Sequence, residues 1–322
     1  MKVWTLAVAG AIAIASAIAP SAVIASDYPN KSIRLIVPYP AGGASDVVAR
    51  LFAALLTKKL GQQVFVENKP GANGQIGSEI VAHAKPDGYT LLSTVTSSHA
   101  VAPALGRKLP YDPITSFAPV IKIGDSIQTL VVRKGLPVSS TRELIEYAKA
   151  HPGKLNYGSP GIGSIGHLGG ALFAMAAHVD LVHVPFKGDG EAMQEVIADR
   201  LDMLVTPLAR PAVAAGLVKV MGIASGHRSA LVPTWPTIAE SGVPYDLTSW
   251  VGVMAPAGTP PEIVQKLNEV GNQILQDPDV KRRYGDLGYD AVGGSAEQFR
   301  NAIAHDIAQF RKINETLKIR LD

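Results

Sequence analysis

Apolar and polar residues alternate along the chain in blocks that fit an α/β fold. In the N-terminal part, short apolar runs at 33–37, 63–67 and 89–93 have the length and β-branched content of strands. Between these runs, 45–60 and 76–84 carry apolar residues at helical spacing. Strands that alternate with helices over short loops predict an α/β unit built on a mostly parallel sheet.

A second set of the same kind fills the middle of the chain. It has expected strands at 128–132, 155–158, 181–186, 202–206 and 219–224 and expected helices at 141–150, 165–177 and 192–198. We expect one crossing between the sets at 111–119, which has the composition of a loop, and another at 244–248. An expected strand at 250–255 and helices at 261–276 and 296–316 then return the chain to the first set.

Two α/β sets joined by two crossings are typical of a hinged receptor with a cleft between two lobes. A chain of 322 residues is long enough for such a pair. We assign residues 26–125 plus 248–322 to lobe 1 and residues 126–247 to lobe 2.

The N-terminus predicts export. Lys2 precedes an apolar stretch at about 6–19, and the small residues Val23 and Ala25 stand just before Ser26. A basic start, an apolar middle and small residues at the cleavage site are typical of a secretory signal peptide, here residues 1–25. A transmembrane anchor is the alternative, but the apolar run is short for a membrane span. We therefore expect a periplasmic protein.

Composition excludes several functions. The chain has no Cys, which removes thiol catalysis, zinc–thiolate sites and disulfides. Hydrophobic residues make up 47% and charged residues 18%, as in a globular protein. The net charge of +3 is spread without a run of five or six Lys or Arg, so we expect no nucleic-acid partner.

Two glycine-bearing loops are the candidate binding elements. Residues 39–46 and 159–164 each join an expected strand to an expected helix. The start of a helix carries unpaired N–H donors and partial positive charge, so it accepts an anion without Arg or Lys. The alternative is that both are tight turns in which Gly and Ser serve only the geometry. One such loop in each lobe favours binding.

Motifs for catalysis are missing. The sequence Gly161-x-Gly163-x-x-Gly166 matches a dinucleotide fingerprint, but the acidic residue after the next strand, Asp189, comes late, and export argues against a nicotinamide cofactor. We find no nucleophile elbow, no phosphate loop and no pair of His at helical spacing. We therefore expect no enzyme, no cofactor and no metal.

The order of short motifs along the chain resembles one family. The matching segments include Tyr28-Pro29, Ile36-Val37-Pro38-Tyr39-Pro40-Ala41-Gly42-Gly43, Glu67-Asn68-Lys69-Pro70-Gly71-Ala72, Pro86-Asp87-Gly88-Tyr89-Thr90-Leu91, Tyr157-Gly158-Ser159-Pro160-Gly161-Ile162-Gly163-Ser164 with His167, and Ala255-Pro256-Ala257-Gly258-Thr259-Pro260. They resemble Bug-type proteins, the substrate-binding components of tripartite tricarboxylate transporters, over essentially the whole mature chain.

This resemblance implies the α/β two-lobe periplasmic-binding-protein fold (Venus flytrap, type II), with a hinge and an interlobe cleft. It implies a small organic anion that bears a carboxylate, held partly by backbone N–H groups and waters, and inner-membrane permease subunits as partners. We expect a monomer. The candidate ligand-binding residues are Tyr39, Ala41, Gly42, Gly43, Asp46, Ser97, Ser159, Gly163, Ser164, His167 and Thr206.

The chain departs from the family pattern in two places. Gly188-Asp189-Gly190-Glu191 carries acidic residues where the family often has small residues and Pro, and Leu204-Val205-Thr206 lacks the acidic residue that some members carry. These departures leave the solute open among carboxylates, amino acids, aromatic acids and amides. An enzyme on the same fold and a sensory receptor that signals to a membrane kinase are the alternatives to a transport receptor.

Overall fold

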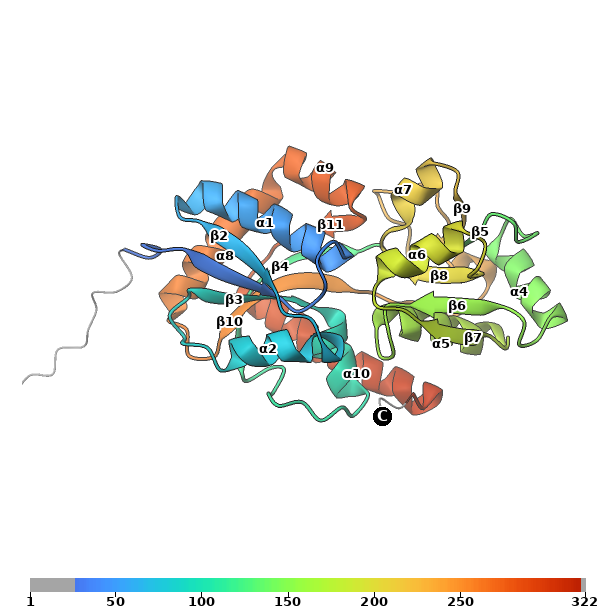
Figure 1. Cartoon of the computed structure of the whole chain (residues 1–322), viewed down its shortest axis with the longest axis horizontal. Helices are drawn as coiled ribbons and strands as arrows, with labels where there is room; N and C mark the ends of the chain where they lie inside the picture. The colour runs from blue at the N-terminus through green and yellow to red at the C-terminus, as the bar shows by residue number, and fades with distance from the viewer. Residues whose placement is uncertain (1–26, 320–322) are drawn as a thin grey trace, which may run out of the picture.

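The computed structural model describes residues 27–319, and the predicted signal peptide at 1–25 lies outside them. Two α/β lobes lie side by side in this part of the chain (Figure 1). The described residues of lobe 1 form a six-stranded sheet in the order β11-β4-β10-β3-β1-β2, and those of lobe 2 a five-stranded sheet in the order β7-β6-β8-β5-β9.

The elements of lobe 1 come from both ends of the chain. Its strands are β1 (Ile33–Val37), β2 (Val64–Asn68), β3 (Thr90–Val95), β4 (Phe117–Ser126), β10 (Trp250–Pro256) and β11 (Tyr289–Ala291). Its helices are α1 (Ala44–Leu60), α2 (Gln75–Ala82), α3 (Ala102–Ala104), α8 (Pro261–Gln276), α9 (Pro278–Asp286) and α10 (Ala296–Leu317), with a 3-10 turn at Ala72–Gly74 and a π turn at Ser97–Val101.

Lobe 2 is one continuous segment. Its strands are β5 (Thr129–Arg133), β6 (Asn156–Ser159), β7 (Val182–Pro185), β8 (Met203–Thr206) and β9 (Val218–Ile223). Its helices are α4 (Thr141–Ala150), α5 (Ile165–Ala177), α6 (Asp189–Ile197) and α7 (Ala209–Ala214), with a 3-10 turn at Ala239–Ser241.

The two sheets share one topology apart from the additional edge strand β11 of lobe 1, and most strands of each sheet run in the same direction. In lobe 1, β2, β1 and β3 are parallel, and β10 lies antiparallel between β3 and β4. In lobe 2, β7, β6 and β8 are parallel, and β5 lies antiparallel between β8 and β9. The strand that enters from the other lobe is the antiparallel one in each case. Strands β1, β2, β3 and β4 of lobe 1 run in one direction, as do β6, β7, β8 and β9 of lobe 2, so the prediction of mostly parallel sheets is confirmed.

The loop expected at 111–119 ends earlier than predicted. Phe117 already begins β4, which pairs with β10 on one side and β11 on the other. Pro119 favoured a loop, because Pro lacks the N–H that a central strand donates. In the structure it lies where the β4–β10 register shifts between Val253 and Met254, and such irregularities tolerate Pro. The first crossing consequently falls at 127–128.

Both faces of the lobe 1 sheet are covered, which explains why β1 carries buried apolar side chains on both of its faces, with Arg34 as the one polar residue. Leu35 packs in a cluster with Phe52 of α1 and Leu267 of α8, whereas the next residue, Ile36, packs in the cluster on the opposite face. Successive side chains of a strand point to opposite faces, so a strand of a sheet covered on both sides buries apolar residues at successive positions, as Leu35 and Ile36 do. Helices lie above and below the sheet in Figure 1.

Helix α10 links the two lobes. Its residues Phe299 and Phe310 belong to the same buried cluster as Phe173 of α5 in lobe 2. The helix packs on β4 and extends beneath lobe 2, where the C-terminus lies (Figure 1). The lobes thus share apolar contacts on this side.

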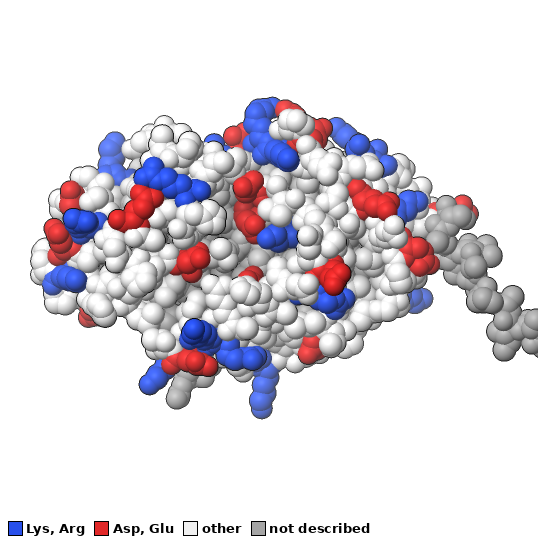
Figure 2. All heavy atoms as spheres, turned by 180° about the vertical axis from the view of Figure 1, so that it is seen from behind, with Lys and Arg blue, Asp and Glu red and all other residues white. Residues whose placement is uncertain are grey.

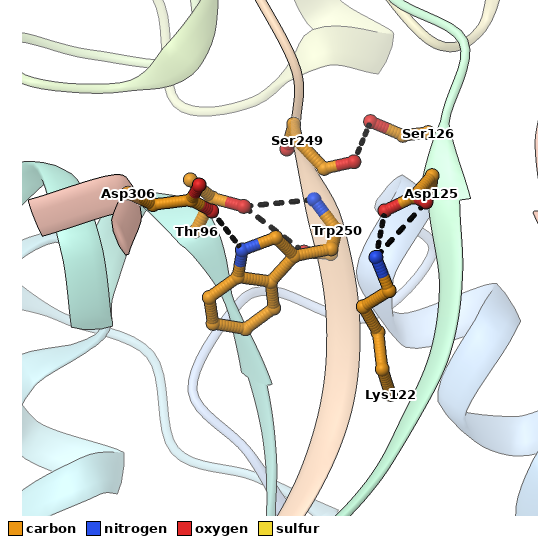
Figure 3. Close-up of polar contacts among 7 residues, drawn as sticks. All are labelled: Thr96, Lys122, Asp125, Ser126, Ser249, Trp250 and Asp306. Atoms are coloured by element: carbon orange, nitrogen blue, oxygen red, sulfur yellow. Dashed lines mark hydrogen bonds and ion pairs between the residues drawn. The ribbon is translucent and has the colours of Figure 1, made fainter. Parts of the chain in front are cut away.

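The hinge lies where the two crossings run next to each other (Figure 3). The Ser126 N–H donates to the Ser249 carbonyl at 2.7 Å, and the Ser126 hydroxyl donates to the same carbonyl at 3.4 Å (Figure 3). The Trp250 N–H donates to Thr96 Oγ1 at 2.7 Å, and its indole Nε1–H donates to Asp306 Oδ2 at 2.6 Å. Burial raises the pKa of Asp306, while the bond from Trp250 opposes this shift. These bonds fix the start of β10 between β3 and α10.

Charges are mixed on the face of the molecule opposite to the view of Figure 1. Lys and Arg side chains are interspersed there with Asp and Glu (Figure 2). This face therefore carries no continuous field of one sign. Elsewhere among the described residues, ion pairs such as that of Arg133 Nε with Asp202 Oδ1 join opposite charges at 2.7 Å.

We predict that Asp306 stabilises the fold as an acceptor and not as a charge. Asp306→Ala should lower the free energy of unfolding by about 1–3 kcal/mol, because the buried indole N–H of Trp250 loses its acceptor. Asp306→Asn keeps an acceptor oxygen for the indole N–H and should lower the free energy of unfolding much less. Urea unfolding of both variants measures the difference, and equal losses would contradict the prediction.

Candidate functional site

A cavity of about 360 Å³ lies between the lobes. The loops after β1, β6 and β7 reach it, together with the hinge. Its lining residues from lobe 1 and the hinge are Tyr39, Pro40, Ala41, Gly42, Gly43, Ala44, Ser45, Asn73, Val95, Ser97, Gln128, Ser249, Trp250 and Tyr289. Those from lobe 2 are Pro160, Ser164, Ile165, Gly166, Lys187, Gly188, Asp189, Gly190, Glu191 and Pro207. Carboxyl ends of parallel strands meet here, as at the ligand sites of other open α/β sheets.

Asp46 shapes the first loop and does not line the cavity. Its Oδ2 accepts from the Gly42 N–H and from Arg50 Nε, both at 2.9 Å, and its Oδ1 accepts from Asn68 Nδ2 at 2.8 Å. Burial opposes ionisation of Asp46, but these three donors hold its pKa below the usual range. Gly42, at φ +81°, lets the loop turn so that its N–H reaches the carboxylate. Asp46 is 2% exposed and its carboxylate accepts from all three donors, so it holds the loop in position.

The first turn of α1 is left open toward the cavity. Gly43 is its N-cap in an extended conformation, and no side chain caps the helix. Ala44 and Ser45 line the cavity and belong to the first turn, whose N–H groups have no partner within the helix. The sequence prediction of an anion-accepting loop at 39–46 therefore corresponds to a helix start at the cavity wall.

Three of the predicted binding residues support the backbone of the second loop, namely Ser159, Gly163 and His167. Ser159 is fully buried, and its hydroxyl bonds to the Gly161 backbone and to His183 Nε2 at 2.7 Å. The Gly163 N–H donates to His167 Nδ1 at 3.1 Å. Ser164 differs because it lines the cavity while its hydroxyl caps α5 by accepting from the His167 N–H at 3.2 Å.

Stacked rings hold this loop from behind. His167 and His183 stack with centroids 4.1 Å apart, and Tyr157 packs against both. Burial, helped by the neighbouring His183, lowers the pKa of His167 to about 4, and burial also lowers the pKa of His183. His167 is therefore neutral at neutral pH, which it must be to accept from Gly163.

A third helix start, missed by the sequence analysis as a site, also reaches the cavity. Helix α6 begins at Asp189, three residues before the expected 192, after the extended N-cap Gly188. Glu191 accepts from the Lys187 N–H at 3.0 Å. Two acidic residues in a first turn are typical of a helix start, and this signal could have located the site. Thr206, also predicted, is fully buried beneath this turn and accepts from the Leu208 N–H.

The lobes contact each other beside the cavity. Asn73 Nδ2 donates to the Gly163 carbonyl at 3.2 Å, and the Ile165 N–H donates to Ser97 Oγ at 3.3 Å. Tyr39 supports the first contact, since its hydroxyl donates to the Asn73 carbonyl at 3.3 Å. Ser97, a predicted binding residue, thus both lines the cavity and bridges the lobes.

The arrangement is suited to binding an anion. Three helix starts, those of α1, α5 and α6, face one cavity, and each offers backbone N–H groups and partial positive charge. Within residues 27–319, no group of three or more His, Asp or Glu could hold a metal ion. None of the helices in this range is long and apolar enough to cross a membrane.

Comparison with known proteins identifies the family to which this chain belongs. Residues 48–319 match the model of the tripartite tricarboxylate transporter family receptor. Protein BugT of Bordetella pertussis is 36% identical over 309 residues, which cover 95% of this chain and 94% of BugT.

Solved structures agree with this match. Rpa4515 of R. palustris with adipate superposes with a TM-score of 0.87 at 35% identity, covering 91% of this chain and 99% of that one. MatC of Rhodopseudomonas palustris with bound malate superposes with a TM-score of 0.82 at 34% identity, covering 89% of this chain and 99% of MatC. The chain therefore belongs to the receptor family of tripartite tricarboxylate transporters, the Bug-type periplasmic solute-binding proteins with a two-lobe fold.

Proposed function

We propose that this protein captures a small carboxylate-bearing solute in the periplasm and delivers it to the inner-membrane permease subunits of a tripartite tricarboxylate-type transporter. The observation that carries the proposal is the meeting of two helix starts, that of α1 from lobe 1 and that of α5 from lobe 2, at one interlobe cavity. Relatives with bound adipate and malate support it, since both molecules bear carboxylates. Residues 1–25, as a cleaved signal peptide, would account for export.

In this proposal the backbone binds the carboxylate and the buried side chains keep the backbone in place. The N–H groups of Ala44 and Ser45 in lobe 1 and of Gly166 in lobe 2 belong to helix starts that line the cavity, and they would donate to the anion. Asp46 and His167 hold the two loops without contacting the solute. Such a site binds an anion without a cationic side chain, because oriented N–H groups supply the charge.

The lobes 26–125 plus 248–322 and 126–247 would move as units about the paired crossings. Bonds across the cleft, from Asn73 to Gly163 and from Ile165 to Ser97, favour the closed arrangement. A solute that contacts both lobes adds to these bonds only when the lobes are closed, so it shifts the equilibrium toward closure.

Ligand binding should stabilise the mature chain. At about a hundred times its dissociation constant, a bound solute adds about 2.7 kcal/mol to the free energy of unfolding. A thermal-shift screen of refolded, ligand-free protein against small carboxylates, amino acids, aromatic acids and amides would show it. Stabilisation by neutral compounds alone would contradict carboxylate capture.

Removing one backbone donor should weaken binding without harming the fold. In Ala44→Pro the ring replaces the N–H at the first position of α1, where Pro is tolerated and where the preceding Gly43 is already extended at φ −72° and ψ 164°. A hydrogen bond to a charged group contributes about 1.5–3 kcal/mol, so affinity should fall roughly tenfold to a hundredfold. Calorimetric titration measures the change.

Ala296→Pro is the matched control. It places Pro at the first position of α10, after the extended N-cap Ser295 and away from the cavity. We expect its affinity to equal that of the unmodified protein. Unchanged binding in Ala44→Pro, with this control also unchanged, would remove α1 from the site.

Closure should reduce the size of the protein in solution. Small-angle scattering of the ligand-free mature chain should give a larger radius of gyration than the same sample saturated with the solute found in the screen. Identical scattering in both states would contradict closure, although the binding site itself could still be correct.

A further inference from the structure

Two loops of the cavity carry an Asp in the first turn of the following helix, but the two carboxylates have different surroundings. Asp46 of α1 accepts from Gly42, Arg50 and Asn68. Asp189 of α6 lines the cavity, and among the described residues no cationic side chain stabilises its charge. The hydroxyl of Thr206 is the side-chain group that favours its ionised form.

The other charged residues of the cavity wall do not compensate Asp189. They lie on the same turn, at Lys187 and Glu191. Lys187 is exposed, and the Glu191 carboxylate accepts from the Lys187 N–H. From lobe 1, Tyr39 and Tyr289 face Asp189, and its negative charge raises the pKa of both hydroxyls further above the value set by their burial. Lobe 1 therefore presents neutral groups to this carboxylate.

A carboxylate in this position disfavours a second carboxylate nearby and favours a cation. Moving a charge away from water is costly unless an opposite charge or hydrogen bonds compensate it. Asp189 also occupies the positive end of α6, so that end is less available to an anionic solute. The starts of α1 and α5 carry no acidic group that faces the cavity, and they remain open to a carboxylate.

We propose that Asp189 is the specificity-determining residue of this receptor and selects solutes that carry a protonated amine at the end remote from the carboxylate. The proposal rests on the proposed function, because it assumes that the solute's carboxylate binds at the helix starts. The amine of the solute forms an ion pair with Asp189 and the carboxylate lies toward Ala44. A dicarboxylate of the same length places its second negative charge against Asp189.

The test compares solutes of equal length. The refolded, ligand-free mature chain is titrated calorimetrically with 4-aminobutanoate, 5-aminopentanoate and 6-aminohexanoate, and with succinate, glutarate and adipate. Near neutral pH, the best amino acid should bind about tenfold or more tightly than the dicarboxylate of its own length. In Asp189→Asn this preference should disappear, because the amide keeps the shape of the side chain and removes its charge.

Glu195→Gln is the matched control for charge. It removes one negative charge from the same helix, but Glu195 pairs with Arg200 at the surface and does not line the cavity. The preference of Glu195→Gln for amino acids over dicarboxylates should equal that of the unmodified protein.

Burial raises the pKa of Asp189 to about 6, with Thr206 opposing the shift. Amino-acid affinity should therefore increase as the pH rises through about 6, where Asp189 becomes ionised.

The outcomes separate this inference from the proposed function. Equal or tighter binding of the dicarboxylates, unchanged in Asp189→Asn, would overturn the role of Asp189 and leave carboxylate capture intact. If neither series binds while another carboxylate stabilises the protein in the thermal-shift screen, the inference is wrong and carboxylate capture stands.

Discussion

Every helix begins with backbone N–H groups that have no partner inside the helix, and in this protein three such beginnings meet at one cavity. The start of α1 has no side-chain cap, since Gly43 offers no acceptor. At the start of α5, Ser164 accepts from the His167 N–H and Ser97 accepts from the Ile165 N–H, which leaves the N–H of Gly166 open. The remaining donors need water or a ligand, and the partial positive charge of the helix starts favours a ligand with negative charge.

Keeping these donors in place requires buried polar side chains behind the loops. Asp46 holds Gly42, and His167 holds Gly163, each through a bond to the backbone four residues before it. Both groups work in one protonation state, Asp46 ionised because of its donors and His167 neutral because of its burial. The wall that faces the solute can then consist largely of backbone, which leaves solute selection to a few side chains such as Asp189.

The hinge couples this site to the rest of the molecule. Trp250 lines the cavity, starts β10 and bonds to Thr96 and Asp306 (Figure 3). A change in the angle between the lobes therefore acts on a residue that is held by β3 and α10 of lobe 1. The core that α10 shares with α5 gives this movement a fixed apolar contact on one side.

The sequence by itself determined the two α/β sets, the helix starts at 39–46 and 159–164, and the family, because these depend on local apolar spacing and on motifs contiguous in the chain. It could not determine the partners of buried groups. Asp46 is a first-turn acid in the sequence, but only tertiary packing brings Asn68 to it; Ser159 meets His183 in the same way. The sequence predicted a loop that included Pro119, because the strand to which Pro119 belongs forms only by pairing with the distant β10. Asp189 resembles Asp46 in the sequence, and only the folded cavity shows that it lacks an Arg, since the position of a charge partner is decided by contacts between segments far apart in the chain.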